Sequence, residues 1–82
     1  MRLLIAEDEL DLAEALTVFF ERNHFTVDAV HNGADAYDYG VSGEYDAIIL
    51  DVMMPGEDGF ATCRRIRALA ACPILFLTAK TE

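Results

Sequence analysis

Short runs of apolar residues recur along this chain, with longer amphipathic stretches between them. The runs 2–6, 47–50 and 73–77 are almost wholly apolar and lack the alternation of a half-exposed strand. This pattern favours strands buried on both faces, as in a parallel sheet covered by helices. The run 25–30 alternates more and is expected nearer a sheet edge. The pattern therefore predicts four strands.

The stretches between the strands have helical periodicity. Over 9–22 the apolar positions recur at helical spacing, and they are Leu12, Leu16, Phe19 and Phe20. Over 58–69 they recur at every third position, and they are Phe60, Cys63, Ile66 and Leu69. We expect these residues to form the apolar face of each helix, and Asp8 to cap the first one. The stretch 34–41 is a weaker helix, because it is short and contains Gly40.

Strands and helices thus alternate along the chain in the order β-α-β-α-β-α-β. Alternation of this kind predicts an α/β fold with a parallel sheet and right-handed crossovers. Turn residues at 31–34 and 41–46 mark connections within the domain, and no linker or repeat divides it. We therefore expect one domain over residues 1–82.

Composition fits a single globular domain, because 54% of the 82 residues are hydrophobic and 26% are charged. A chain of this length buries only about 60 to 65% of its unfolded surface, so it would be marginally stable without a staple or a partner. Cys63 and Cys72 lack the number and spacing of a disulfide framework or a zinc site, and no signal-peptide pattern is visible. A reduced, cytoplasmic compartment is the expected location.

The charge balance narrows the choice of partners. Fifteen acidic residues against six basic ones give a net charge of −9. Binding to a phosphate backbone depends on Lys and Arg, so this chain is not expected to contact nucleic acid directly. The longest apolar runs are also far shorter than the roughly 20 residues that a membrane-spanning helix needs.

Acidic side chains follow two of the predicted buried strands. Glu7 and Asp8 come after the first strand, and Asp51 comes after the third. Thr78 follows the fourth strand. The carboxyl ends of parallel strands meet at one sheet edge, where ligands bind in such folds. Like charges gathered there call for a cation, and a hard ion with oxygen ligands, Mg²⁺ before Ca²⁺, is the expected occupant.

Asp51 can also act as a nucleophile toward phosphorus and form an aspartyl phosphate. Phosphoryl transfer depends mainly on positioning and on neutralising the charge of the transferred group. A metal ion beside Asp51 would supply that charge, and the Thr78 hydroxyl could contact a phosphoryl oxygen.

The arrangement resembles the receiver domains of two-component response regulators. The resemblance rests on "EDE" at 7–9, "LDVMMPGEDGF" at 50–60 and "LTA" at 77–79, together with their separations. The motifs "EDE", "MMPG-DG" and "CRRIRA" are most similar to those of receivers that carry a winged-helix DNA-binding output domain. The resemblance implies a flavodoxin-like fold, with helices on both faces of a parallel sheet.

The resemblance also implies a role for each matching residue. Asp51 would be the phosphoacceptor, and Glu7 and Asp8 would hold Mg²⁺ together with Asp51 and the backbone carbonyl of Met53. Thr78 would be the switch hydroxyl. The phosphodonor would be a phosphohistidine on a histidine kinase, and the full-length protein would regulate an output such as transcription.

The family's domain continues beyond the part that matches here. A fourth helix, a fifth strand and a fifth helix have no counterpart in this sequence. The family's lysine at the end of the fifth strand, which pairs with the phosphoryl group, is therefore absent, and Lys80 does not take its place. We expect this piece to carry no output domain and to be impaired in switching. A fourth strand left at the sheet edge and an uncovered sheet face predict self-association, including exchange of strands or helices.

Two other functions remain open at this point. One is an oligomerising assembly module without signalling of its own. The other is a phosphohydrolase with an aspartyl nucleophile, although such enzymes commonly place an acid two residues after the nucleophile and this chain has Met53 there.

Several residues also have plainer interpretations. Glu7 and Asp8 could be no more than an acidic first turn of a helix, favoured by its dipole. Thr78 could simply end a strand. We interpret His24 and His31 as surface residues rather than phosphohistidines or metal ligands.

Overall fold

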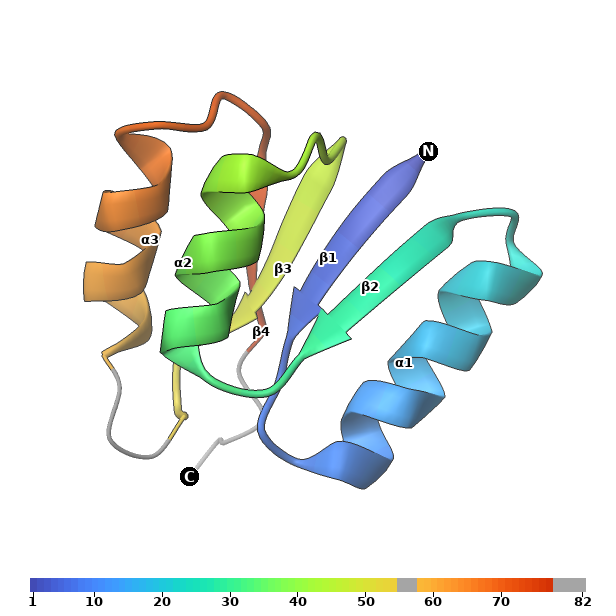
Figure 1. The fold of residues 1–82 in the computed structure, drawn as a ribbon. Helices are drawn as coiled ribbons and strands as arrows, with labels where there is room; N and C mark the ends of the chain where they lie inside the picture. The colour runs from blue at the N-terminus through green and yellow to red at the C-terminus, as the bar shows by residue number, and fades with distance from the viewer. Residues whose placement is uncertain (55–57, 78–82) are drawn as a thin grey trace.

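The computed structural model describes residues 1–54 and 58–77, and within them strands and helices alternate as the sequence predicts (Figure 1). All three helices and four strands fall within two residues of their predicted bounds at each end. Their bounds are β1 Arg2–Ala6, α1 Leu10–Arg22, β2 Thr26–Val30, α2 Gly33–Ser42, β3 Ala47–Asp51, α3 Gly59–Arg67 and β4 Ile74–Leu77.

The four strands form one parallel sheet in the order β2-β1-β3-β4. The β1 residue Ala6 is paired with Val30 of β2 on one side and with Leu50 of β3 on the other. This register aligns the carboxyl ends of β1 and β3, so the residues that follow them emerge at the same edge of the sheet. The predicted flavodoxin-like arrangement of these elements is confirmed.

Helices lie on both faces of the sheet: α2 and α3 cover one face and α1 lies against the other (Figure 1). The core sits mainly under α2 and α3. It comprises Leu4, Ala6, Val30, Ala36, Ile48, Leu50, Met54 and Ile66, all of them buried. The runs 2–6 and 47–50 therefore fill the sheet centre, as their lack of alternation indicates.

The fourth strand departs from the prediction that it is buried on both faces. Leu75 and Phe76 of β4 are 56% and 42% exposed. The reason is position: β4 is the outer strand of the described sheet, and α1 lies over β1 and β2 on the opposite side. Phe76 still packs against Phe60 of α3, with ring centroids 4.9 Å apart.

The apolar faces of α1 and α3 are narrower than predicted. Phe19 on α1 is 59% exposed, Phe60 on α3 is 54% exposed, and Leu69, two residues beyond the end of α3, is 64% exposed. The buried positions of α3 are Gly59, Thr62 and Ile66, of which Ile66 was predicted. A repeat of exactly three residues drifts around a helix that has 3.6 residues per turn, so its ends leave the buried face.

At the amino ends of the strands, Arg2 ties β1 to its neighbours. Its guanidinium forms an ion pair with Asp28 of β2 at 3.0 Å, and it lies 4.7 Å from the ring centre of Tyr45. The Tyr45 hydroxyl donates to the same Asp28 oxygen at 2.7 Å. Burial, together with this bond, raises the pKa of Tyr45 to about 12. This end of the sheet is therefore fixed by polar contacts, far along the strands from their acidic ends.

None of the helices in the described ranges 1–54 and 58–77 is long and apolar enough to cross a membrane.

We predict that Gly59→Ala destabilises the protein. A Cβ at position 59 would lie 2.5 Å from the Cα of Val52 and 3.0 Å from the carbonyl oxygen of Asp51, so α3 would have to move away from the end of β3. Overpacking of this kind costs about 1 to 3 kcal/mol. Chemical denaturation measures the loss, with Arg67→Lys on the exposed side of α3 as a control. An unchanged free energy of unfolding would show that the close approach is absent.

Self-association through β4 stays a prediction. Exposed apolar edges pair with other chains, and a charge on such an edge opposes pairing. We expect light scattering to show a dimer or larger assembly at tens of micromolar protein. Leu75→Lys should shift it toward monomer, whereas Thr26→Lys on the other edge strand should not. A wild-type protein that is monomeric under these conditions would contradict the prediction.

Candidate acidic site at the carboxyl ends of the strands

Glu7, the first residue after β1, is held in place by three hydrogen bonds. Its amide donates to the carbonyl of Val30 at 3.0 Å, which extends the pairing with β2 by one step. Its carboxylate oxygen Oε2 accepts from the amide of Glu9 at 2.9 Å. The ring Nδ1 of His31 lies 3.0 Å from its carbonyl oxygen. Glu7 is therefore a buried, fixed residue, only 2% exposed.

The prediction that Asp8 caps α1 is wrong. The helix begins at Leu10, its N-cap is Glu9, and no side chain caps it there. The carboxylate that accepts a hydrogen bond in this turn belongs to Glu7, and the donor is the amide of Glu9, two residues later. Asp8 is consequently not occupied in capping the helix.

Asp51 is the last residue of β3 and is 3% exposed. Its carboxylate oxygen Oδ1 accepts from the amide of Met53 at 2.9 Å, which orients the side chain. The close approach of Gly59 to the Asp51 carbonyl brings α3 up to this point. Asp58 caps α3 by accepting from the amide of Phe60.

Glu7, Asp8 and Asp51 converge into one acidic cluster. Each offers a carboxylate oxygen, and these oxygens all lie within 4.8 Å of one another. Two of the three residues are buried and Asp8 is half-buried. The convergence follows from the register of β1 and β3, which are adjacent and parallel.

The electrostatics of the cluster are unfavourable without a cation. Burial, and secondarily the neighbouring charges of Asp51 and Asp8, raise the pKa of Glu7 from 4.5 to about 7. The Glu7 oxygen Oε1 is buried and has no hydrogen-bond partner in the described part of the chain. A buried oxygen without a partner is costly. A hard divalent ion bound by carboxylate oxygens would offset the repulsion between the charges and give Oε1 a partner, so the residues fit such an ion.

The other predicted site residues are placed only in part. The side chain of Met53 is 59% exposed, whereas Met54 is buried in the core. Thr78 lies outside the described residues, as do Pro55 and Gly56. Of the predicted site, the structure therefore brings together Glu7, Asp8 and Asp51.

His31 is a neighbour of the site that the sequence interpretation missed. It is exposed, as predicted, but its ring also contacts the carbonyl of Glu7. The available signal was position, because His31 is the first residue after β2 and β2 pairs with β1.

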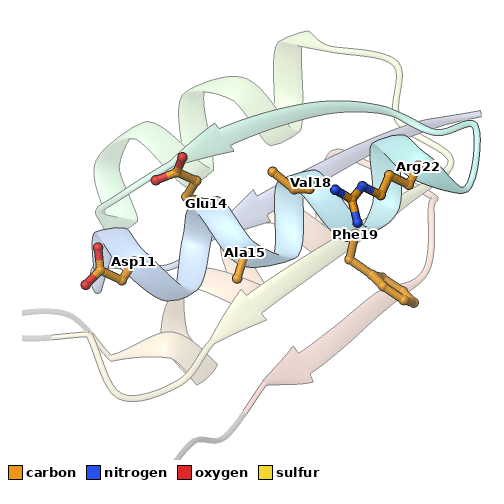
Figure 2. Close-up of a pocket in the computed structure, with 6 residues that line it drawn as sticks. All are labelled: Asp11, Glu14, Ala15, Val18, Phe19 and Arg22. Carbon is orange, nitrogen blue, oxygen red and sulfur yellow. The ribbon is translucent and has the colours of Figure 1, made fainter.

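A separate shallow pocket lies along α1 and does not include the acidic cluster. Figure 2 shows its lining residues, Asp11, Glu14, Ala15, Val18, Phe19 and Arg22. All six come from one helix, and the exposed ring of Phe19 stands at its edge (Figure 2). The pocket offers no cluster of groups for chemistry comparable to the one at the strand ends.

Comparison with known proteins agrees with the fold. The model of the response regulator receiver domain matches residues 3–82. Among curated relatives, the transcriptional regulatory protein ResD of Bacillus subtilis is 42% identical over 81 residues, which cover 99% of this chain and 34% of that protein.

Two solved structures of the response regulator TrrA from Thermotoga maritima are also similar, each at 33% identity. One, in complex with Mg²⁺ and BeF, has a TM-score of 0.90 and is matched over 98% of this chain and 70% of its own. The other, in complex with the histidine kinase ThkA, has a TM-score of 0.89, with 99% and 71% matched.

This chain spans about a third of the length of ResD and about two thirds of the TrrA chains. The family match covers nearly all of the chain, and the parallel sheet with its acidic carboxyl edge is the arrangement that the resemblance implies. The chain belongs to the family of response regulator receiver domains.

Proposed function

We propose that this chain is the phosphoacceptor of a two-component phosphorelay and that Asp51 accepts the phosphoryl group. The observation that carries the proposal is the cluster of three carboxylates from the ends of two adjacent strands, within 4.8 Å of one another. Asp51 is the member that ends β3 itself, and its Oδ1 is held by the Met53 amide. An oxygen of this carboxylate is our proposed nucleophile.

The proposed metal is Mg²⁺, with Glu7, Asp8, Asp51 and the backbone carbonyl of Met53 as its protein ligands. The unpartnered Oε1 of Glu7 supports this assignment, because a cation would satisfy it. When bound, Mg²⁺ would neutralise charge on the phosphoryl oxygens. Thr78 is proposed as the switch hydroxyl on the strength of its place in the sequence alone, since it lies outside the described residues.

The protein's own part in the transfer is positioning. Burial of Asp51 and its bond to the Met53 amide hold the carboxylate in one orientation. An Asp51 oxygen forms a bond to the phosphorus of a phosphohistidine while the phosphorus–nitrogen bond breaks, and the imidazole nitrogen keeps that electron pair. The product is an aspartyl phosphate on this chain and a free histidine on the donor.

The proposed phosphodonor is a histidine kinase, a class of protein with which the relative TrrA has been crystallised. The proposed output is transcription, because ResD is a transcriptional regulatory protein and extends well beyond the matched region. Nucleic acid would be contacted by such an output domain and not by this acidic chain, whose net charge is −9. A cytoplasmic location is part of the same proposal.

Incubation of the protein with Mg²⁺ and acetyl phosphate should add the mass of one phosphoryl group to Asp51. Asp51→Asn should lose essentially all of this label, because an amide is not a nucleophile of the same kind. Asp38→Asn, which removes an exposed carboxylate on α2, serves as the matched control. Mass spectrometry of the intact protein and of its peptides measures the label. Labelling of the Asp51→Asn variant at the wild-type level would contradict the proposal.

We further predict that Glu7→Gln stabilises the metal-free protein at high pH. The pKa of Glu7 is raised to about 7 in the folded state, so the folded state holds this proton more tightly than the unfolded state. The associated stability is fully present below about pH 4.5 and is lost as the pH rises through 7. Glutamine stays neutral throughout. The variant should therefore unfold at a higher temperature than wild type at pH 8 in EDTA, and the difference should shrink toward pH 4.

Added Mg²⁺ provides the internal comparison for this prediction. At pH 8, Mg²⁺ should raise the unfolding temperature of wild type more than that of Glu7→Gln, because binding stabilises the state that binds. Glu21→Gln, an exposed position on α1, controls for the general loss of one negative charge. A Glu7→Gln variant that is less stable than wild type in EDTA at pH 8 would show that the carboxylate is not under strain.

A further inference from the structure

The contact between His31 and Glu7 is a hydrogen bond from a side chain to the backbone beside the acidic cluster. Ring atom Nδ1 of His31 lies 3.0 Å from the carbonyl oxygen of Glu7. A carbonyl oxygen can only accept, so Nδ1 must carry the hydrogen. Residues Leu3–Ala6 of β1, which precede Glu7, are paired with β2 on one side and with β3 on the other.

The histidine ring stands where the ladder between β1 and β2 would otherwise continue. Ala6 is paired with Val30, and the Glu7 amide still donates to the Val30 carbonyl. In a continued parallel ladder the Glu7 carbonyl would accept from the amide of residue 32. Asn32 is instead the N-cap of α2, and its side chain accepts from the Asp35 amide at 2.7 Å. The chain has turned into the helix, and His31 supplies an N–H in place of the lost one.

This bond acts on the peptide unit that joins Glu7 to Asp8. The carbonyl that accepts from His31 and the amide of Asp8 belong to the same rigid plane. Fixing that plane restricts the directions in which the side chains of Glu7 and Asp8 leave the backbone. With the Glu7 amide and Oε2 also bonded, the remaining oxygen Oε1 is the one left for a ligand.

We propose that His31 is a positioning residue that holds Glu7 and Asp8 in the geometry that binds the cation. The proposal rests on the proposed function, since it takes the acidic cluster to be a metal site. The inference goes beyond the proposed function because it assigns a role to a residue outside the acidic cluster, directly after β2. The plainer interpretation, an exposed histidine at a turn, does not explain why its ring bonds to the Glu7 carbonyl.

A pair of substitutions separates the N–H from the shape of the ring. Asn at position 31 can place its amide nitrogen where Nδ1 lies, whereas Leu has nearly the same size and shape as Asn but no donor. His24→Asn is the matched control, because His24 is the only other histidine in the sequence and is exposed in the turn after α1. It has a φ of 73°, which asparagine tolerates.

The measurement is the Mg²⁺ dissociation constant of each protein by calorimetric titration, together with its unfolding temperature in EDTA. Residues that orient metal ligands from outside the ligand set typically contribute 10- to 100-fold to affinity. We expect His31→Leu to weaken Mg²⁺ binding about tenfold, and His31→Asn and His24→Asn to stay within about threefold of wild type. Nitrogen NMR of the metal-free wild type should show a hydrogen on Nδ1 of His31.

The outcomes distinguish this proposal from the one beneath it. If the wild type binds Mg²⁺ and His31→Leu has the same dissociation constant, the positioning role alone is overturned. Equal weakening of Mg²⁺ binding in His31→Leu and His31→Asn overturns it too. An Nδ1 without hydrogen also overturns it. A wild-type protein that binds no Mg²⁺ overturns the proposed metal site, and this inference with it. A lower unfolding temperature in His31→Leu with unchanged affinity assigns the bond to stability and overturns the proposal.

Discussion

Two neighbouring parallel strands end in carboxylates at the same edge of the sheet, and the rest of the site depends on that constraint. The register that pairs Ala6 with Leu50 places Glu7 and Asp51 side by side, largely out of water. The result is an arrangement that costs stability when no cation is present, since the Glu7 pKa rises and one of its oxygens has no partner. A cation bound to these carboxylates would remove that cost, and its binding would be favoured to the same extent.

The surrounding structure keeps these carboxylates from moving apart. The Met53 amide holds Asp51, the Glu9 amide holds Glu7, and the missing side chain of Gly59 lets α3 begin against the end of β3. At the other end of the sheet, the contacts of Arg2 with β2 and with Tyr45 fix the strands relative to each other. Because strands are stiff along their length, register fixed at one end is maintained at the end that carries the chemistry.

Much of this fold follows from the sequence, because uninterrupted apolar runs between amphipathic stretches leave few arrangements other than a parallel sheet. The acidic cluster follows as well, since each member lies at the end of a strand or within two residues after it. What could not be predicted depends on contacts between distant segments. The exposure of Leu75 depends on which strands α1 covers, and Asp8 does not cap α1 because the helix begins at Leu10 with Glu9 as its N-cap. The His31 contact requires knowing where β2 ends relative to β1.

The central claim is that the carboxylates at the ends of β1 and β3 form one site for a metal ion and a phosphoryl group. A crystal structure of the protein grown with Mg²⁺ and beryllium fluoride tests it most directly. The account predicts a beryllium fluoride adduct on the Asp51 carboxylate and a Mg²⁺ ion at about 2.1 Å from oxygens of the acidic cluster. An adduct on a different residue, or an ion bound away from Glu7, Asp8 and Asp51, would contradict it.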